Sequence, residues 1–150
     1  RNPAPKEWCI GEMLDHNTRV FASFFPFVLR AWKAQQRRAE KRRGREYAVD
    51  TADPYRKPSF PQWVGFLWTP RYTPQQEGAL AALMDGNRAL HARVRAFYQD
   101  KDPDLLGNIF VYDPLMGSMN LILVLRVGIY HDQLHFDDVL KMVKAFQEAG

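Results

Sequence analysis

The chain has 150 residues, of which 46% are hydrophobic and 25% are charged, and this size and composition fit one soluble domain over residues 1–150. No stretch approaches the roughly 18 uncharged apolar residues that a membrane span requires. The single cysteine excludes an internal disulfide, so a reducing cytoplasm is the expected compartment.

The first predicted helix runs from about Lys6 to about Arg43. Its apolar side recurs every three or four residues, as one face of a helix requires. That predicted stripe consists of Cys9, Met13, His16, Val20, Phe24, Phe27 and Ala31. Pro26 lies within this segment and should kink the helix, because proline removes one backbone hydrogen bond.

A basic run covers residues 37–46, with six Lys or Arg against two Glu, and the net charge of the chain is +4. A solvated helix end is the favoured interpretation, since cations also complement the dipole there. An acidic protein or lipid partner is the alternative. Nucleic-acid binding is disfavoured, because no recognition motif accompanies the charge.

A long loop is predicted over residues 44–73. Gly44 and four prolines exclude a continuous helix, while the aromatic content is too high for a flexible linker. The aromatic residues include Tyr55, Phe60, Trp63, Phe66, Trp68 and Tyr72. We expect this segment to pack across the helices, because loops of this length usually cover or complete a site.

Two more helices follow in the prediction. Thr73, Pro74 and Gln76 form a helix-start signal, with Thr73 as N-cap. The inner stripe of this helix is predicted as Leu80, Leu83, Met84, Asn87, Leu90, Val94 and Phe97. The helix should end at Asp100–Pro103, and a short apolar link over 105–116 should lead to a last helix from about Met119 to Gln147. Three long helices form an incomplete bundle, which a fourth helix or a partner chain would cover.

Three histidines form the candidate site. His131 and His135 are four residues apart, so on a helix both imidazoles can reach one ion, and Gly128 should leave space beside them. His16 occupies the centre of the stripe of the first helix, where an unpaired imidazole would be costly to bury. Three neutral imidazoles suit a divalent metal, zinc first and nickel or iron(II) as alternatives. His91 is assigned to surface or packing.

Carboxylates near these histidines are candidates for proton handling. Glu12 is preferred as a general base, because it lies one helical turn before His16. Asp15 and Asp132 are interpreted as solvated groups. The segment 131–135 is also similar to the zincin H-E-x-x-H motif with Asp for Glu, but the shorter carboxylate would misplace the base, and this chemistry is disfavoured.

Three segments together resemble one family. The first is similar to the W-S-x-x-E-x-L-x-H segment of the DinB/YfiT-like proteins and reads Trp8-Cys-Ile-Gly-Glu-Met-Leu-Asp-His16. The second, Tyr112–Gly117, is similar to the H-P-x-x-G link of that family. The third, His131-x-x-x-His135, is similar to the family's closing histidine pair. The resemblance implies an all-α four-helix bundle, often dimeric, with the metal on one histidine of the second helix and two of the last. The family's first helix would precede Arg1, so the chain is expected to be incomplete at its N-terminus.

The resemblance also implies a function. Family members include S-transferases that use bacillithiol or mycothiol and a maleylpyruvate isomerase that uses a thiol. A metal-dependent transferase or hydrolase-like enzyme is therefore expected, in which a low-molecular-weight thiol or water is activated. The alternative is a non-catalytic bundle subunit or binding module. In either case, a groove lined by Phe21, Phe25, Val28, Leu125 and Leu140 is predicted to be covered. The cover would be an upstream helix missing from this sequence, or another chain in a homo-oligomer or a complex.

Overall fold

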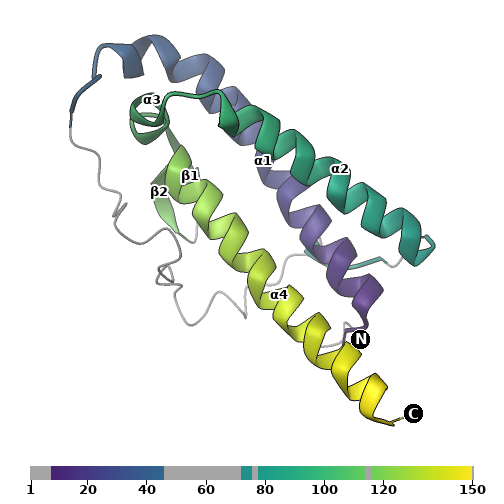
Figure 1. Cartoon of the computed structure of the whole chain (residues 1–150). Coiled ribbons are helices and arrows are strands. Elements are labelled where there is room, and N and C mark those ends of the chain that lie inside the picture. The colour runs from purple at the N-terminus through teal and green to yellow at the C-terminus, as the bar shows by residue number, and fades with distance from the viewer. Residues whose placement is uncertain (1–7, 46–71, 76–77, 114–115, 150) are drawn as a thin grey trace.

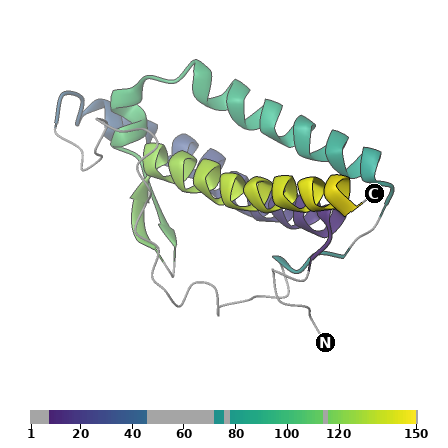
Figure 2. The ribbon, with the colours of Figure 1, turned by 60° about the horizontal axis from the view of Figure 1, so that its bottom comes forward.

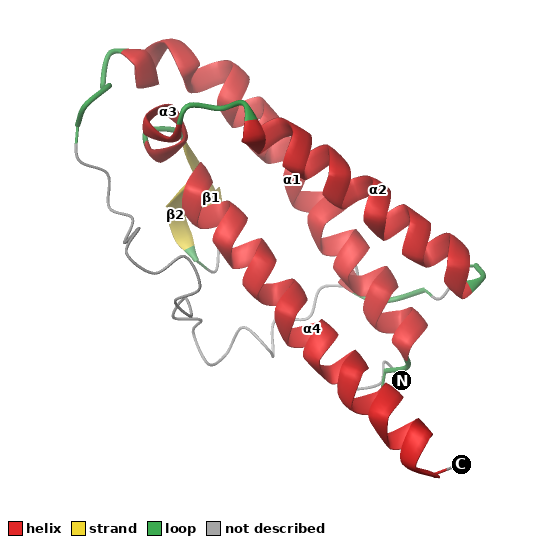
Figure 3. Ribbon diagram, in the orientation of Figure 1, coloured by secondary structure: helices red, strands yellow, loops and turns green. Residues whose placement is uncertain are grey.

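The computed structural model describes residues 8–45, 72–75, 78–113 and 116–149 (Figure 1). Three long helices dominate it: α1 (Ile10–Glu40), α2 (Leu80–Gln99) and α4 (Leu121–Ala149). Between α2 and α4 lie the short helix α3 (Pro103–Gly107) and a hairpin of β1 (Phe110–Asp113) and β2 (Gly117–Asn120). The predicted mostly helical fold is confirmed (Figure 3). Among the described residues, no helix is long and apolar enough to cross a membrane.

Helices α1 and α2 run parallel, and α4 runs antiparallel to both (Figures 1 and 2). Side-chain contacts agree with the parallel direction of α1 and α2. The Asn87 amide donates a hydrogen bond to the Thr18 hydroxyl near the start of α1, and Phe97 packs on Trp32 near its end. Two parallel helices need a connection that returns along the bundle, here about 45 Å for the 31 residues of α1. This distance explains why a long loop was predicted at 44–73. Its predicted packing lies almost entirely outside the described residues.

The predicted start of α2 is wrong. Thr73 is not the N-cap: the helix begins at Leu80 with Ala79 as its cap. Gly78 has a φ of +123°, which a helix cannot contain. The backbone N–H of Gln75 instead donates to Asp15 Oδ2 at 2.6 Å, so the segment is bound to the side of α1. Tertiary contacts therefore override the helix-start signal.

The hairpin was not predicted, because four-residue strands leave little alternation to detect. It pairs Phe110 with Asn120 in antiparallel register. The amide of Gln35 bonds both the N–H and the C=O of Phe110, so α1 covers the free edge of β1. Asn120 then accepts the N–H of Leu123 at 2.9 Å and caps the first turn of α4.

The buried face of α1 is rotated relative to the prediction. Met13, His16 and Ala31 are buried as expected, but Cys9 and Phe27 are exposed. The reason is that α1 packs against α2 as well as α4, which widens its buried side and shifts it. The additional buried residues of this helix are Leu14, Asp15, Asn17, Phe25, Val28 and Ala39. The helix continues through Pro26, and the kink stays a prediction.

The predicted open groove is also corrected. Phe25 and Val28 belong to the core, and Phe21 and Leu125 pack against it; of the five predicted residues Leu140 is exposed, at 66%. The short helix α3 and the hairpin contribute to the core that contains Phe25 and Val28. Large apolar side chains are exposed at the start of α2 and along α4, as well as on α1 and β1. Those of α2 and α4 are Leu80, Met84, Ile129, Leu134, Leu140, Val143 and Phe146.

Candidate metal centre

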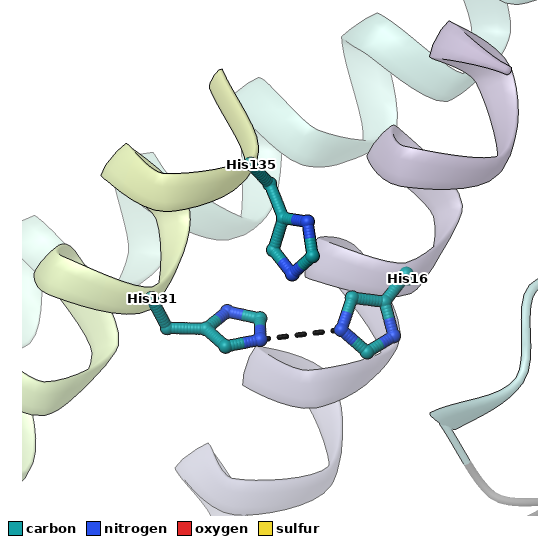
Figure 4. Close-up of side chains that lie close together, drawn as sticks. All are labelled: His16, His131 and His135. Carbon is teal, nitrogen blue, oxygen red and sulfur yellow. Dashed lines mark hydrogen bonds between the residues drawn. The ribbon is translucent and has the colours of Figure 1, made fainter. Parts of the chain in front are cut away.

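The three predicted histidines lie together between α1 and α4 (Figure 4). His16 projects from α1, and His131 and His135 project from successive turns of α4. One nitrogen from each ring lies within 4.8 Å of the others, and His16 is almost fully buried. The geometric condition for a shared ion is therefore met, and binding itself stays a prediction.

The orientation of His16 fits metal coordination. Its Nδ1–H donates to the carbonyl of Tyr72 at 2.7 Å, which leaves the lone pair of Nε2 facing the cluster. That Nε2 lies 3.2 Å from Nε2 of His131. Two nitrogens bound to one zinc at 2.0–2.1 Å with a tetrahedral angle would be about 3.3 Å apart. The pair is thus spaced as two ligands of one ion would be.

Burial keeps two of these rings neutral. It lowers the pKa of His16 to about 4, although the bond to Tyr72 opposes this and the neighbouring His131 adds to it. Burial, with His131 and His16 beside it, also lowers the pKa of His135 to about 4. Both imidazoles are therefore unprotonated at neutral pH, which is the form that binds a metal.

Trp8 covers the cluster on one side. Its side chain is 2% exposed, and its ring centroid lies 4.8 Å from that of His16 and 6.1 Å from that of His135. From the sequence, Trp8 was named only as the first residue of the segment that resembles the DinB/YfiT-like proteins. That resemblance was the one sequence signal that could have placed Trp8 at the site. A buried indole here excludes water from the rings of His16 and His135.

The structure corrects the interpretation of Asp132 as a solvated group and gives His91 a contact with it. Asp132 is 5% exposed rather than solvated, and its Oδ2 lies 2.8 Å from Nε2 of His91 on α2. Its Oδ1 lies 3.7 Å from Nδ1 of His131. Burial alone would raise the pKa of Asp132, but the contacts with His131 and His91 lower it below its usual value. His91 is therefore joined to the cluster through a buried carboxylate.

Asp15 is also buried rather than solvated. Its Oδ2 accepts from Arg19 Nε at 2.8 Å and from the N–H of Gln75. Arg19 also donates to the side chain of Gln75 at 2.9 Å. These contacts hold the segment that carries the Tyr72 carbonyl against α1. Asp15 therefore supports the orientation of His16 indirectly.

Glu12 and Gly128 differ from the expectations for them. The Glu12 carboxylate accepts the N–H of Cys9 at 2.8 Å and so caps α1, while its role in proton handling stays a prediction. The space beside Gly128 is filled by the ring of Phe21, which a Cβ at this glycine would approach to 2.6 Å. No room for substrate is therefore left at Gly128.

A hollow of about 520 Å³ lies at the end of the bundle where α1 and α2 begin. It is lined by Cys9, Ile10, Gly11, Gly78, Leu80, Leu83, Met142 and Phe146. Cys9 precedes His16 by seven residues, and Met142 follows His135 by seven, so the hollow lies about 10 Å along the helices from the cluster. It is mainly apolar and open to solvent beside an exposed thiol.

Comparison with protein families agrees with this geometry. The model of the DinB superfamily matches residues 1–139. The chain belongs to the DinB superfamily. The matched region contains all three clustered histidines and Asp132 of this DinB protein. No curated protein and no solved structure matches the chain.

Proposed function

We propose that this DinB protein is a metal-dependent enzyme in which His16, His131 and His135 hold one divalent ion. The observation that supports this most directly is the 3.2 Å separation of Nε2 of the buried His16 from Nε2 of the half-buried His131. Nδ1 of His16 already donates to a carbonyl. Zinc is our first choice, and nickel or iron(II) would suit the same donors. A bound ion would supply a Lewis acid that lowers the pKa of a thiol or of water.

We propose a thiol S-transferase or a hydrolase-like reaction for this site. Three protein donors leave at least one coordination position for another molecule, as catalytic sites require. Trp8 shields the rings on one side, and the hollow beside Cys9 offers apolar surface for a low-molecular-weight thiol or for its acceptor. Glu12 remains our candidate for moving a proton, and in that role its carboxylate would have to leave the Cys9 N–H.

Metal analysis tests the proposal. Purified protein loaded with zinc should hold about one ion per chain, and His16→Gln, His131→Gln and His135→Gln should each reduce that stoichiometry strongly. His91→Gln is the comparison, because it removes an imidazole outside the proposed ligand set and should still hold one ion per chain when zinc is in excess. Equal metal content in all four variants would contradict the ligand assignment.

A non-catalytic role is the second candidate. The exposed apolar side chains of α2 and α4 favour a bundle that serves as a subunit or binding module, because large apolar patches often mark interfaces. In this case we propose a homo-oligomer or a partner chain that covers the exposed apolar side chains of α4. Thiol-dependent turnover that requires the three histidines would favour the enzyme instead.

A further inference from the structure

The strongest unassigned feature is the buried carboxylate that joins two helices behind the histidine cluster. Asp132 lies on α4, beside the proposed ligand His131, and reaches His91 on α2. Its side chain is 7% exposed, whereas that of His91 is 37% exposed. A buried carboxylate is costly unless it is paired, so a specific arrangement must compensate it here.

Two buried polar atoms face each other at this point. Nδ1 of His131 and Oδ1 of Asp132 are both buried without a hydrogen-bond partner among the described residues. They are 3.7 Å apart, slightly beyond hydrogen-bond distance, and one can donate while the other accepts. A small rotation of either side chain would satisfy both atoms at once.

On its other side, the carboxylate faces α2. Oδ2 of Asp132 lies 2.8 Å from Nε2 of His91, and the ring of His91 packs edge-on against Phe21, with centroids 5.3 Å apart. Phe21 in turn fills the space beside Gly128 of α4. The carboxylate is thus held between two imidazoles, one of them in the cluster and one outside it.

We infer that Asp132 is a positioning residue for His131, and that His91 holds Asp132 in place. This inference rests on the proposed metal site and deepens it. By accepting from Nδ1–H, Asp132 would keep the ring of His131 with Nε2 toward His16, where the 3.2 Å separation is found. Carboxylates in this role typically change metal affinity ten- to hundredfold when they are removed.

Zinc affinity, measured by competition with a chromophoric chelator, tests the inference. Asp132→Asn should weaken binding ten- to hundredfold. Asp137→Asn, which removes an exposed carboxylate from the same helix, should bind like wild type. His91→Ala should give a smaller loss than Asp132→Asn. His91 is partly exposed, so this variant also serves if Asp132→Asn fails to fold.

A second measurement does not depend on the metal. In metal-free protein, the ¹⁵N resonance of His131 Nδ1 should shift in Asp132→Asn but not in Asp137→Asn. If neither that resonance nor zinc affinity distinguishes the two variants, the inference is overturned. If wild type binds no zinc while the resonance still responds to Asp132→Asn, the proposed function fails and the positioning of His131 stands.

Discussion

The ring of Phe21 on α1 packs against the backbone of Gly128 on α4, where an added Cβ would come within 2.6 Å of Cζ. Gly128→Ala should therefore lower the free energy of unfolding. Overpacking costs about 1–3 kcal/mol, against about 1 kcal/mol that alanine gains over glycine within a helix. We expect a net loss of about 1 kcal/mol in denaturant titration.

Gly86 in α2 is the matched control for this substitution. It also lies within a helix, but nothing is within 4 Å of the position of its added Cβ. Gly86→Ala should stabilise the protein by about 0.5–1 kcal/mol. Stabilisation of similar size by both alanines would show that Phe21 moves freely away from Gly128.

The stability of metal-free protein should depend on pH through His16 and His135. Their pKa is about 4 in the folded chain, against 6.5 for an ordinary histidine, so between these values the unfolded chain binds more protons. Stability should therefore be complete above about pH 6.5 and fall toward pH 4, by up to about 1.4 kcal/mol per pH unit for each residue. Chemical denaturation across this range in the presence of a chelator measures it.

Substitutions test whether His16 and His135 cause this pH dependence. His16→Asn and His135→Asn should each reduce the slope between pH 6.5 and pH 4 by about half, because each removes one of the two imidazoles whose pKa is lowered to about 4. His91→Asn should change it less, since that side chain is partly exposed. A slope that is the same in wild type and in both buried-site variants would contradict the assignment.

Two roles of Glu12 can be separated by substitution. Glu12→Gln keeps an oxygen that can accept the Cys9 N–H but cannot take up a proton at neutral pH. It should leave stability nearly unchanged, whereas Glu12→Ala should cost about 1 kcal/mol as a lost helix cap. If Glu12 also handles a proton, Glu12→Gln should lower kcat more than KM changes. Unchanged turnover in Glu12→Gln would leave capping as its role.

The sequence predicted the histidine cluster because its geometry depends on two strong patterns. His131 and His135 repeat at one helical turn, and His16 lies on an apolar side, so facing α1 and α4 bring the three together. The contacts that support these histidines depend on α2, and local sequence patterns could not predict them. Asp132 contacts His91 only because α2 lies antiparallel to α4, and nothing local in either segment indicates that.

The errors at the start of α2 and in the stripe of α1 have a similar origin. Thr73 and Pro74 form a good local signal, yet Asp15 and Arg19 bind the following Gln75 to α1. The predicted stripe of α1 followed a single helix face, whereas α1 contacts both α2 and α4. Helix propensity and periodicity are local properties, and packing on two sides decides the final arrangement.

The basic run contains residues with different roles. Arg43 forms ion pairs with Glu40 and with Asp102, and so joins the end of α1 to the start of α3. Changing Arg38, Lys41 and Arg42 together to Gln should leave the melting temperature unchanged, while Arg43→Gln should lower it. The effect of Arg43→Gln should diminish with added salt. Salt-dependent loss of a bound partner in the triple variant would instead indicate a binding surface.

The exposed apolar side chains of α4 should mediate association. Leu140 is 66% exposed and Phe146 is 75% exposed, and burying each such side chain contributes about 1.5–3 kcal/mol. Sedimentation should therefore show an oligomer or a stable complex. Leu140→Ser with Phe146→Ser should dissociate it without unfolding the chain, because neither side chain belongs to the core. Ala34→Ser with Ala96→Ser, at exposed positions of α1 and α2, is the control and should leave association unchanged. A stable wild-type monomer with no bound partner at high concentration would contradict this prediction.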